Sequence, residues 1–280
     1  MSDDLAYRRI AVASAFSPRF EMVLAEAKRV RDRFDADLNL IYVGDKDEQT
    51  ERRFAEALAG MGLPAESLIH YQTGNPAEAI IKAASDNNVE LIVAGALEKE
   101  VVLRPFLGNV ARRLVREACC SVMLFTKPDR EPKPLRRIVF YVADYNEHTR
   151  QALCRAARLA EREGAENLYV IRVYTTFDAA RATLRESQPD NPAHAAARTL
   201  EEEEDALEEF IESACETEVP VEARCISGNT GFVASDFVQA VEADLLVASI
   251  EPTSSPDLDE LPAHISWVTD VIPCNLWVIR

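Results

Sequence analysis

Short apolar runs alternate with amphipathic stretches along the whole chain. Five runs in the first half have the length of buried strands: 9–14, 38–43, 67–72, 91–95 and 122–126. Between them apolar residues recur at helical spacing, so that Val23, Ala27 and Val30, for example, share one helix face. Continuous apolar strands between amphipathic helices are typical of a parallel sheet with helices on both faces. Right-handed crossovers arrange such a sheet as a doubly wound α/β fold.

The same pattern returns in the second half. Residues 74–125 align with residues 228–279 without a gap, at a constant offset of 154 residues. The identical pairs include Gly74/Gly228, Asn75/Asn229, Leu91/Leu245, Val93/Val247, Ala94/Ala248, Leu107/Leu261 and Cys120/Cys274. Self-similarity over this length indicates a duplicated domain, in which one copy is free to lose its site.

We therefore predict two tandem domains, each a doubly wound, five-stranded parallel sheet. Domain 1 covers 1–127, residues 128–134 form a charged, proline-rich linker, and domain 2 covers 135–280. The start of the second copy matches at an offset of 128 residues, so about 26 residues are inserted into domain 2. They lie near 175–204 and predict a solvated acidic helix, with a partner-binding arm as the alternative.

Composition narrows the classes of function. The formal net charge of −17 over 280 residues argues against nucleic acids and anionic membranes as partners, because both carry negative charge. No apolar run approaches the ~18 residues that span a bilayer, and the N-terminus lacks the regions of a signal peptide, so we expect a cytoplasmic protein. The six cysteines lack metal-ligand spacing, which favours reduced, mostly buried thiols over metal or redox chemistry.

Doubly wound sheets bind their ligands at the carboxyl ends of the strands, where the winding reverses. In domain 1 this crevice lies between the end of the first strand, at Ala15, and the end of the fourth, at Gly95. Further along, Gly108, Asn109 and Val110 begin a helix, and backbone amides at a helix start bind anions such as phosphate. Asn109 can both cap this helix and donate to a phosphate oxygen. A capped surface helix without a ligand is the alternative.

Four features together resemble the universal stress protein family. They are the strand Leu91–Gly95, its spacing to Gly108-Asn109-Val110, the segment Gly74–Ile81 and the final run Ala118–Phe125. The resemblance extends over both halves, so the chain resembles a tandem-type member with two such domains. It implies the Rossmann-like fold of the adenine nucleotide alpha hydrolases, in agreement with the pattern of strands, and a role in stress response.

The resemblance also implies a nucleotide motif. ATP-binding members of the family carry Gly-x-x-Gly, nine residues, and then Gly-Ser or Gly-Thr, where the glycines leave room for the triphosphate. This chain has Gly95-Ala-Leu-Glu98, nine residues and Gly108-Asn109, so the spacing is kept and two of the four residues are replaced. Glu98 places a carboxylate beside the phosphates, and two unit charges at about 4 Å repel by ~4 kcal/mol at a surface-like dielectric constant.

Domain 1 therefore keeps a degenerate site in this interpretation. Ala15 stands where the family usually has an aspartate near the ribose and adenine, whereas Val43 matches the usual apolar adenine contact. The ligand that the resemblance implies is ATP or another adenine nucleotide, with Mg. The candidate nucleotide-binding residues are Ala15, Val43, Gly95, Gly108, Asn109 and Val110.

Domain 2 departs further from the motif. At the same offset the four motif positions become Ser249, Pro252, Pro262 and Ala263. A proline at the phosphate turn removes an N–H donor and the room that glycine provides. Asp144 follows the first strand of domain 2, near the place of the family aspartate, but without a phosphate loop it is typical of a turn or cap. We expect no triphosphate there.

The sequence offers no reaction. It contains no nucleophile elbow, zinc-protease motif or Walker loop, so we predict no catalytic residue and no metal site. The resemblance favours a non-enzymatic stress-response factor that acts by protein association, with at most weak nucleotide binding in domain 1. An ATP-binding switch that uses domain 1 and a small nucleotide hydrolase remain the alternatives. Expected partners are the chain itself, by domain pairing or as a homodimer, and a protein whose identity the sequence does not reveal.

Overall fold

The computed structural model describes residues 5–14, 17–64, 67–96, 107–188, 190–251, 263–269 and 272–280. Contacts divide the chain into two compact units. Unit 1 comprises Met1–Pro134, Pro252–Leu261 and Thr269–Arg280, and unit 2 comprises Leu135–Glu251 and Pro262–Val268. The division by contacts thus differs from the division by repeats, since the end of the second repeat belongs to unit 1.

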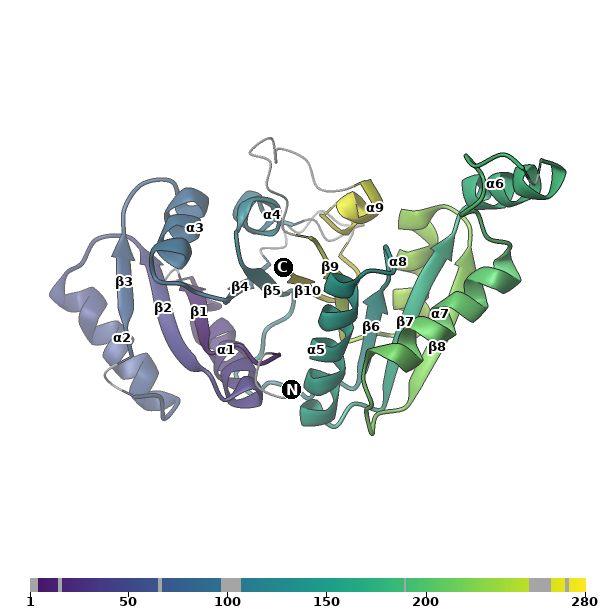
Figure 1. Ribbon diagram of the computed structural model, residues 1–280. Helices are drawn as coiled ribbons and strands as arrows, with labels where there is room; N and C mark the ends of the chain where they lie inside the picture. Colours follow the sequence, from purple (N-terminus) through teal and green to yellow (C-terminus); the bar gives the residue numbers. More distant parts are fainter. Residues whose placement is uncertain are drawn as a thin grey trace. The chain divides into compact units, whose positions relative to one another are not determined.

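Unit 1 contains the parallel sheet predicted for the first repeat (Figure 1). Its strands are β1 (Arg9–Ser14), β2 (Asp37–Val43), β3 (Ile69–Gln72), β4 (Leu91–Gly95), β5 (Ser121–Phe125) and β10 (Asn275–Ile279). Their order is β3-β2-β1-β4-β5-β10, and the first five strands run parallel. The winding therefore reverses between β1 and β4, as a doubly wound fold requires.

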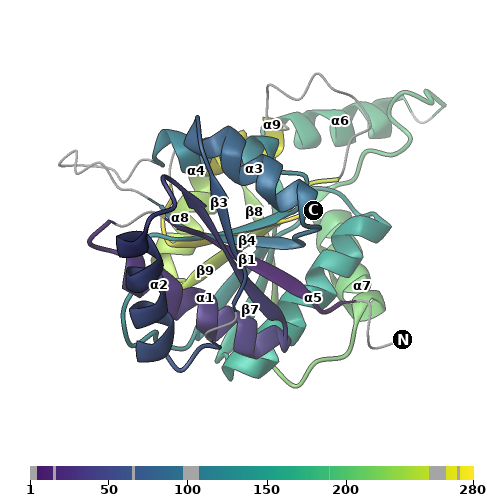
Figure 2. The same cartoon turned by 90° about the vertical axis from the view of Figure 1, so that its left-hand side faces the viewer.

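Helices cover both faces of this sheet. They are α1 (Phe20–Phe34), α2 (Glu48–Gly60), α3 (Pro76–Asp86) and α4 (Asn109–Glu117). Figure 2 shows α1 and α2 on one face and α3 and α4 on the other. Because both faces are covered, Leu91, Ile92 and Val93 are all fully buried although their side chains alternate between faces.

Local signals position these elements as the sequence predicts. Asp47 caps α2 by accepting from the Thr50 amide at 2.7 Å. Asn75 caps α3 in the same way, with proline at the first turn. The preceding glycine, Gly74, has a φ of +103°, and its counterpart Gly228 has a φ of +145°. Both copies thus use glycine where an L side chain is disfavoured, which explains why this position is identical in the two repeats.

Unit 2 has the same winding. Its strands are β6 (Arg137–Tyr141), β7 (Asn167–Tyr174), β8 (Val221–Ser227) and β9 (Leu245–Ser249), in the parallel order β9-β6-β7-β8. Its helices are α5 (Glu147–Glu163), α6 (Thr176–Ser187), α7 (Leu200–Ala214), α8 (Thr230–Ala240) and the short α9 (Ala263–Ser266), which continues into the 3-10 helix η1 (Trp267–Thr269). The mostly parallel α/β fold predicted from the apolar pattern is confirmed.

The last strand is placed in a way that the sequence does not predict. β10 pairs antiparallel with β5 inside unit 1, with Leu276 opposite Leu124 and Trp277 opposite Met123. Trp277 is fully buried, and its ring lies 5.9 Å from that of Phe34 and 6.1 Å from that of Tyr7. The final strand of the second repeat therefore completes the core of unit 1.

The inserted segment also differs in part from its prediction. It forms α6, the chain that follows and the first turn of α7. Phe177 on α6 is 68% exposed, as a solvated helix requires, but Glu203 on α7 is only 6% exposed. The prediction of a solvated acidic helix is therefore wrong for Glu203, because the start of α7 packs into unit 2.

Candidate functional site

The carboxyl edge of unit 1 brings the ends of three strands together. β1 pairs with β2 on one side and with β4 on the other, so Val43 and Gly95 flank the end of β1 at the same edge. Val43 is half-buried. Two residues of the predicted site region, Ala15 and Glu98, lie outside the part of the chain that the structure describes.

Gly95 is packed closely against α1. A Cβ atom built on Gly95 would lie 3.0 Å from Cγ2 of Val23, so a larger residue would push that side chain away. The chain then continues to Ala96, whose amide donates to the Phe125 carbonyl at 2.9 Å. A glycine at this position therefore lets α1 pack directly against the end of β4.

Gly108, Asn109 and Val110 lie at the start of α4, as predicted. Gly108 is the N-cap residue, with φ −64° and ψ 155°, and no side chain caps the helix. The predicted cap by Asn109 is wrong, because Asn109 is the first helical residue and its side chain is exposed. Amides at an uncapped helix start keep their hydrogens available for an anion.

Arg113, one turn further along α4, is not among the site residues predicted from the sequence. Its Nη1 atom donates to Oδ1 of Asn75 at 3.1 Å, and its guanidinium forms ion pairs with Glu78 and Glu117. The hydrogen bond from Arg113 lowers the pKa of Glu117 to about 2. Arg113 thus ties the start of α3 to α4, and its charge is already shared between two carboxylates. The signal for it in the sequence is the offset pair Arg113/Trp267, a cation replaced by a large apolar ring.

In unit 2 a buried serine side chain occupies the position that corresponds to Gly95. Its counterpart Ser249 is buried, and its hydroxyl shares a hydrogen bond of 3.3 Å with that of Thr149 on α5. Pro252 and Pro262, the counterparts of Glu98 and Gly108, lie outside the described residues.

A polar cluster surrounds the buried Glu203 at the carboxyl edge of unit 2. Arg172 on β7 forms an ion pair of 2.9 Å with Glu203, and the hydroxyl of Tyr145, just after β6, donates to the same carboxylate at 2.9 Å. The guanidinium groups of Arg172 and Arg198 lie 5.3 and 5.2 Å from the centre of the Tyr145 ring. Burial, followed by the charge of Glu203, raises the pKa of Tyr145. Side chains of unit 2 itself thus provide the charge and hydrogen-bond partners at this edge. Asp144, by contrast, is exposed.

In unit 2, an aromatic pair packs between the end of β6 and the start of α8. The ring of Trp267, the counterpart of Arg113, lies 6.0 Å from that of Tyr141 at the end of β6. A Cβ atom on Gly231, in the first turn of α8, would lie only 2.7 Å from Cβ of Trp267. This close packing leaves the start of α8 in direct contact with a side chain.

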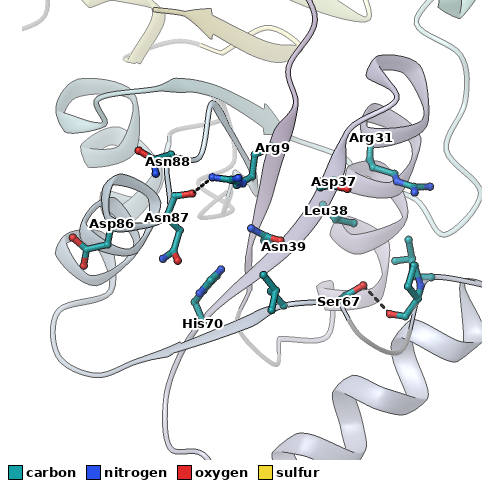
Figure 3. Close-up of a pocket in the computed structure, with 13 residues that line it drawn as sticks. Arg9, Arg31, Asp37, Leu38, Asn39, Ser67, His70, Asp86, Asn87 and Asn88 are labelled. Atoms are coloured by element: carbon teal, nitrogen blue, oxygen red, sulfur yellow. Dashed lines mark hydrogen bonds between the residues drawn. The ribbon is translucent and has the colours of Figure 1, made fainter.

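A separate cavity of about 720 Å³ lies at the opposite, amino-terminal edge of the unit 1 sheet (Figure 3). Arg9 donates to the carbonyl of Asn87 at 2.7 Å there, and burial followed by the charge of Arg9 lowers the pKa of His70. The lining contains both cationic and anionic side chains, among them Arg9, Arg31, Asp37 and Asp86. Among the residues that the structure describes, no predicted nucleotide-binding residue lines this cavity.

The described residues contain no group of three or more His, Cys, Asp or Glu side chains that could hold a metal ion. The thiol of Cys119, in the turn between α4 and β5, is exposed. Its pKa is lowered to about 6, first by a hydrogen bond from Cys120, with smaller effects of Ser85 and Arg280. A lowered pKa favours the thiolate form of Cys119 near neutral pH.

We expect Cys119 to be alkylated by iodoacetamide with a half-maximal rate near pH 6. Because its pKa is lowered to about 6, the reactive thiolate is already present at neutral pH. The half-buried Cys225 is the control, since burial raises its pKa to about 11. Peptide mass spectrometry after timed alkylation measures both rates. A rate at Cys119 that still rises steeply above pH 8 would contradict the prediction.

Comparison with known proteins identifies the family. The family model described as "Universal stress protein family" matches residues 6–126 and again residues 135–255. The chain belongs to the universal stress protein family. The two matches confirm the tandem arrangement, and the predicted similarity to this family is thereby confirmed.

Solved structures that resemble this universal stress protein share its fold. A protein of Pseudomonas aeruginosa PAO1, described as functionally unknown, is 15% identical with a TM-score of 0.71, over 98% of this chain and 93% of that chain. A universal stress protein from Archaeoglobus fulgidus DSM 4304 is 16% identical with a TM-score of 0.67, over 97% and 98% of the two chains. No curated protein matches significantly. None of the described helices is long and apolar enough to cross a membrane.

Proposed function

We propose that this universal stress protein is a non-enzymatic, cytoplasmic stress-response factor that acts by associating with other proteins. In this proposal, unit 1 binds an adenine nucleotide such as Mg-ATP at most weakly, and unit 2 binds none. The observation that carries it is the contrast between the two carboxyl edges. The edge of unit 1 keeps Gly95, Gly108 and an uncapped α4, whereas in unit 2 Ser249 and Glu203 are buried against their own neighbours.

The surface of unit 2 supports the part of the proposal that concerns association. Phe177 and Leu184 on α6 are 68% and 42% exposed, and the described helices offer no counterpart of α6 in the first repeat. The free cysteines fit a reducing compartment such as the cytoplasm.

Calorimetric titration with Mg-ATP tests the nucleotide site. Glu98→Gly is expected to bind Mg-ATP at least about fivefold more tightly than the parent, because removing the carboxylate relieves a repulsion on the order of 1 to 4 kcal/mol. Gly108→Pro is expected to weaken binding by about tenfold, because it removes one amide donor. The backbone of Gly108, at φ −64°, accepts proline without strain, so α4 is expected to remain folded.

Ser249→Gly is the matched control, because it restores the motif glycine only in the second repeat and is expected to leave binding unchanged. Sedimentation of the same samples reports whether the nucleotide alters the oligomeric state. If Glu98→Gly binds no better than the parent, or if Gly108→Pro binds as well, the nucleotide does not use this edge. Phosphate release during the titration would show a hydrolase instead.

A further inference from the structure

The fold brings two cysteines of unit 2 together from distant parts of the chain. Cys154 lies on α5, and Cys215 is the residue at which α7 ends. The Sγ atom of Cys154 donates to the carbonyl oxygen of Ala214 at 3.2 Å, so it reaches the backbone immediately before Cys215. Nη1 of Arg150 donates to the same carbonyl at 3.3 Å, which brings a guanidinium to the two sulfurs.

The two thiols have different chemical roles. A hydrogen bond from Cys215 lowers the pKa of Cys154, and the charge of Arg150 adds to this effect. The same hydrogen bond raises the pKa of Cys215. Cys154 is therefore the nucleophile of the pair, and Cys215 keeps its proton until it attacks the oxidised Cys154.

Access suits a small oxidant. Cys154 is 7% exposed, and Cys215 is half-buried at the end of its helix. A molecule of the size of hydrogen peroxide fits such a site better than a bulky disulfide does. Three other cysteines differ from this pair. Cys119 and Cys120 are neighbours in sequence, and burial raises the pKa of Cys225 to about 11.

We propose that Cys154 and Cys215 form an oxidation-sensitive dithiol that closes into a disulfide with hydrogen peroxide. The Cys154 thiolate attacks one peroxide oxygen, an S–O bond forms, the O–O bond breaks, and hydroxide leaves and takes up a proton to become water. The Cys215 sulfur then attacks the sulfenic sulfur, the S–S bond forms, the S–O bond breaks, and the second water leaves with the Cys215 proton. One peroxide thus oxidises two thiols and yields two waters.

The disulfide fastens the end of α7 to α5. α7 also carries Glu203, which fills the carboxyl edge of unit 2, so oxidation fixes the helix that closes this edge. The bond closes a long loop, which restricts the unfolded chain. The oxidised protein is expected to regain its free thiols with dithiothreitol, because the thiols of dithiothreitol reduce the disulfide by thiol–disulfide exchange.

The test uses the full-length chain treated with a small excess of hydrogen peroxide, followed by alkylation and non-reducing peptide mapping. A peptide pair joined through Cys154 and Cys215 is expected, together with a rise in the Tm of unit 2 of roughly 5 °C, reversed by dithiothreitol. Cys154→Ser and Cys215→Ser should each abolish the joined peptides. Cys225→Ser is the matched control and should keep them.

The parent protein alone decides the outcome, even if a serine variant fails to fold. The proposal is overturned if Cys154 and Cys215 both remain open to alkylation after unfolding while peroxide has oxidised the exposed Cys119. It is equally overturned if the joined peptides contain other cysteines, or if Cys154 proceeds to a sulfinic acid without a link to Cys215.

Discussion

Glu203→Ala is expected to lower the free energy of unfolding of unit 2 by about 3 kcal/mol. The carboxylate is 6% exposed and accepts from both Arg172 and Tyr145, each at 2.9 Å. Removing it leaves the partly buried guanidinium of Arg172 without its carboxylate partner. The Tyr145 hydroxyl loses its 2.9 Å acceptor and keeps only the backbone carbonyl of residue 203, at 3.5 Å. Urea denaturation, followed by hydrogen exchange of peptides from β6 and β7, measures the loss in unit 2.

Two variants separate the buried ion pair from the general acidity of α7. Glu204→Ala removes an exposed carboxylate from the neighbouring position and should change stability by less than about 0.5 kcal/mol. Replacing both partners, Arg172→Met with Glu203→Leu, should recover most of the loss, because no unpaired charge then remains buried. If Glu203→Ala is as mild as Glu204→Ala, the ion pair does not stabilise unit 2.

Trp277→Ala is expected to destabilise unit 1 by about 4 kcal/mol, although this residue belongs to the second repeat. Its ring is fully buried and packs edge-on against Tyr7 and Phe34 of the first repeat. Truncation therefore opens a cavity in the core of unit 1 and weakens the pairing of β10 with β5. Hydrogen exchange of peptides from β1 and α1, before and after the substitution, measures the effect.

Trp277→Phe and Trp267→Ala are the controls. Phenylalanine keeps an aromatic ring beside Tyr7 and Phe34 and removes an indole N–H that has no hydrogen-bond partner within the described structure, so the loss should be less than half that of alanine. Trp267→Ala removes the ring that packs on Tyr141 and should weaken unit 2 instead. Loss of protection in β6 to β9 alone after Trp277→Ala would contradict the placement of β10.

The two repeats differ in structure at their carboxyl edges. The carboxyl edge of unit 1 keeps Gly95, Gly108 and an uncapped helix start. In unit 2 the substitutions are supported by neighbours: Ser249 bonds to Thr149, and Glu203 neutralises Arg172. Replacing a single residue in unit 2 would therefore leave the other side chains at this edge in place. For this reason the control Ser249→Gly is expected to leave Mg-ATP binding unchanged.

The sequence by itself determined the secondary structure, the duplication and the family. The apolar runs and helical spacings are local signals. They predict which residues are buried, but not which distant residues they contact. Caps and turns are equally local, as Asn75 and the paired glycines Gly74 and Gly228 show. The positions of Val43, Gly95 and Gly108 at one edge could also be predicted, because parallel strands align their carboxyl ends.

Only the tertiary structure decided which elements share a core. The run that forms β10 is apolar in either placement, so its pattern does not distinguish pairing with the first repeat from pairing with the second. Glu203 stands within an acidic stretch that is typical of a solvated helix, and its burial depends on Arg172, which is distant in sequence. The approach of Cys154 to the end of α7 is likewise a long-range contact. The spacing of apolar residues shows which side chains are buried. The residues that they contact depend on how distant segments of the chain pack together.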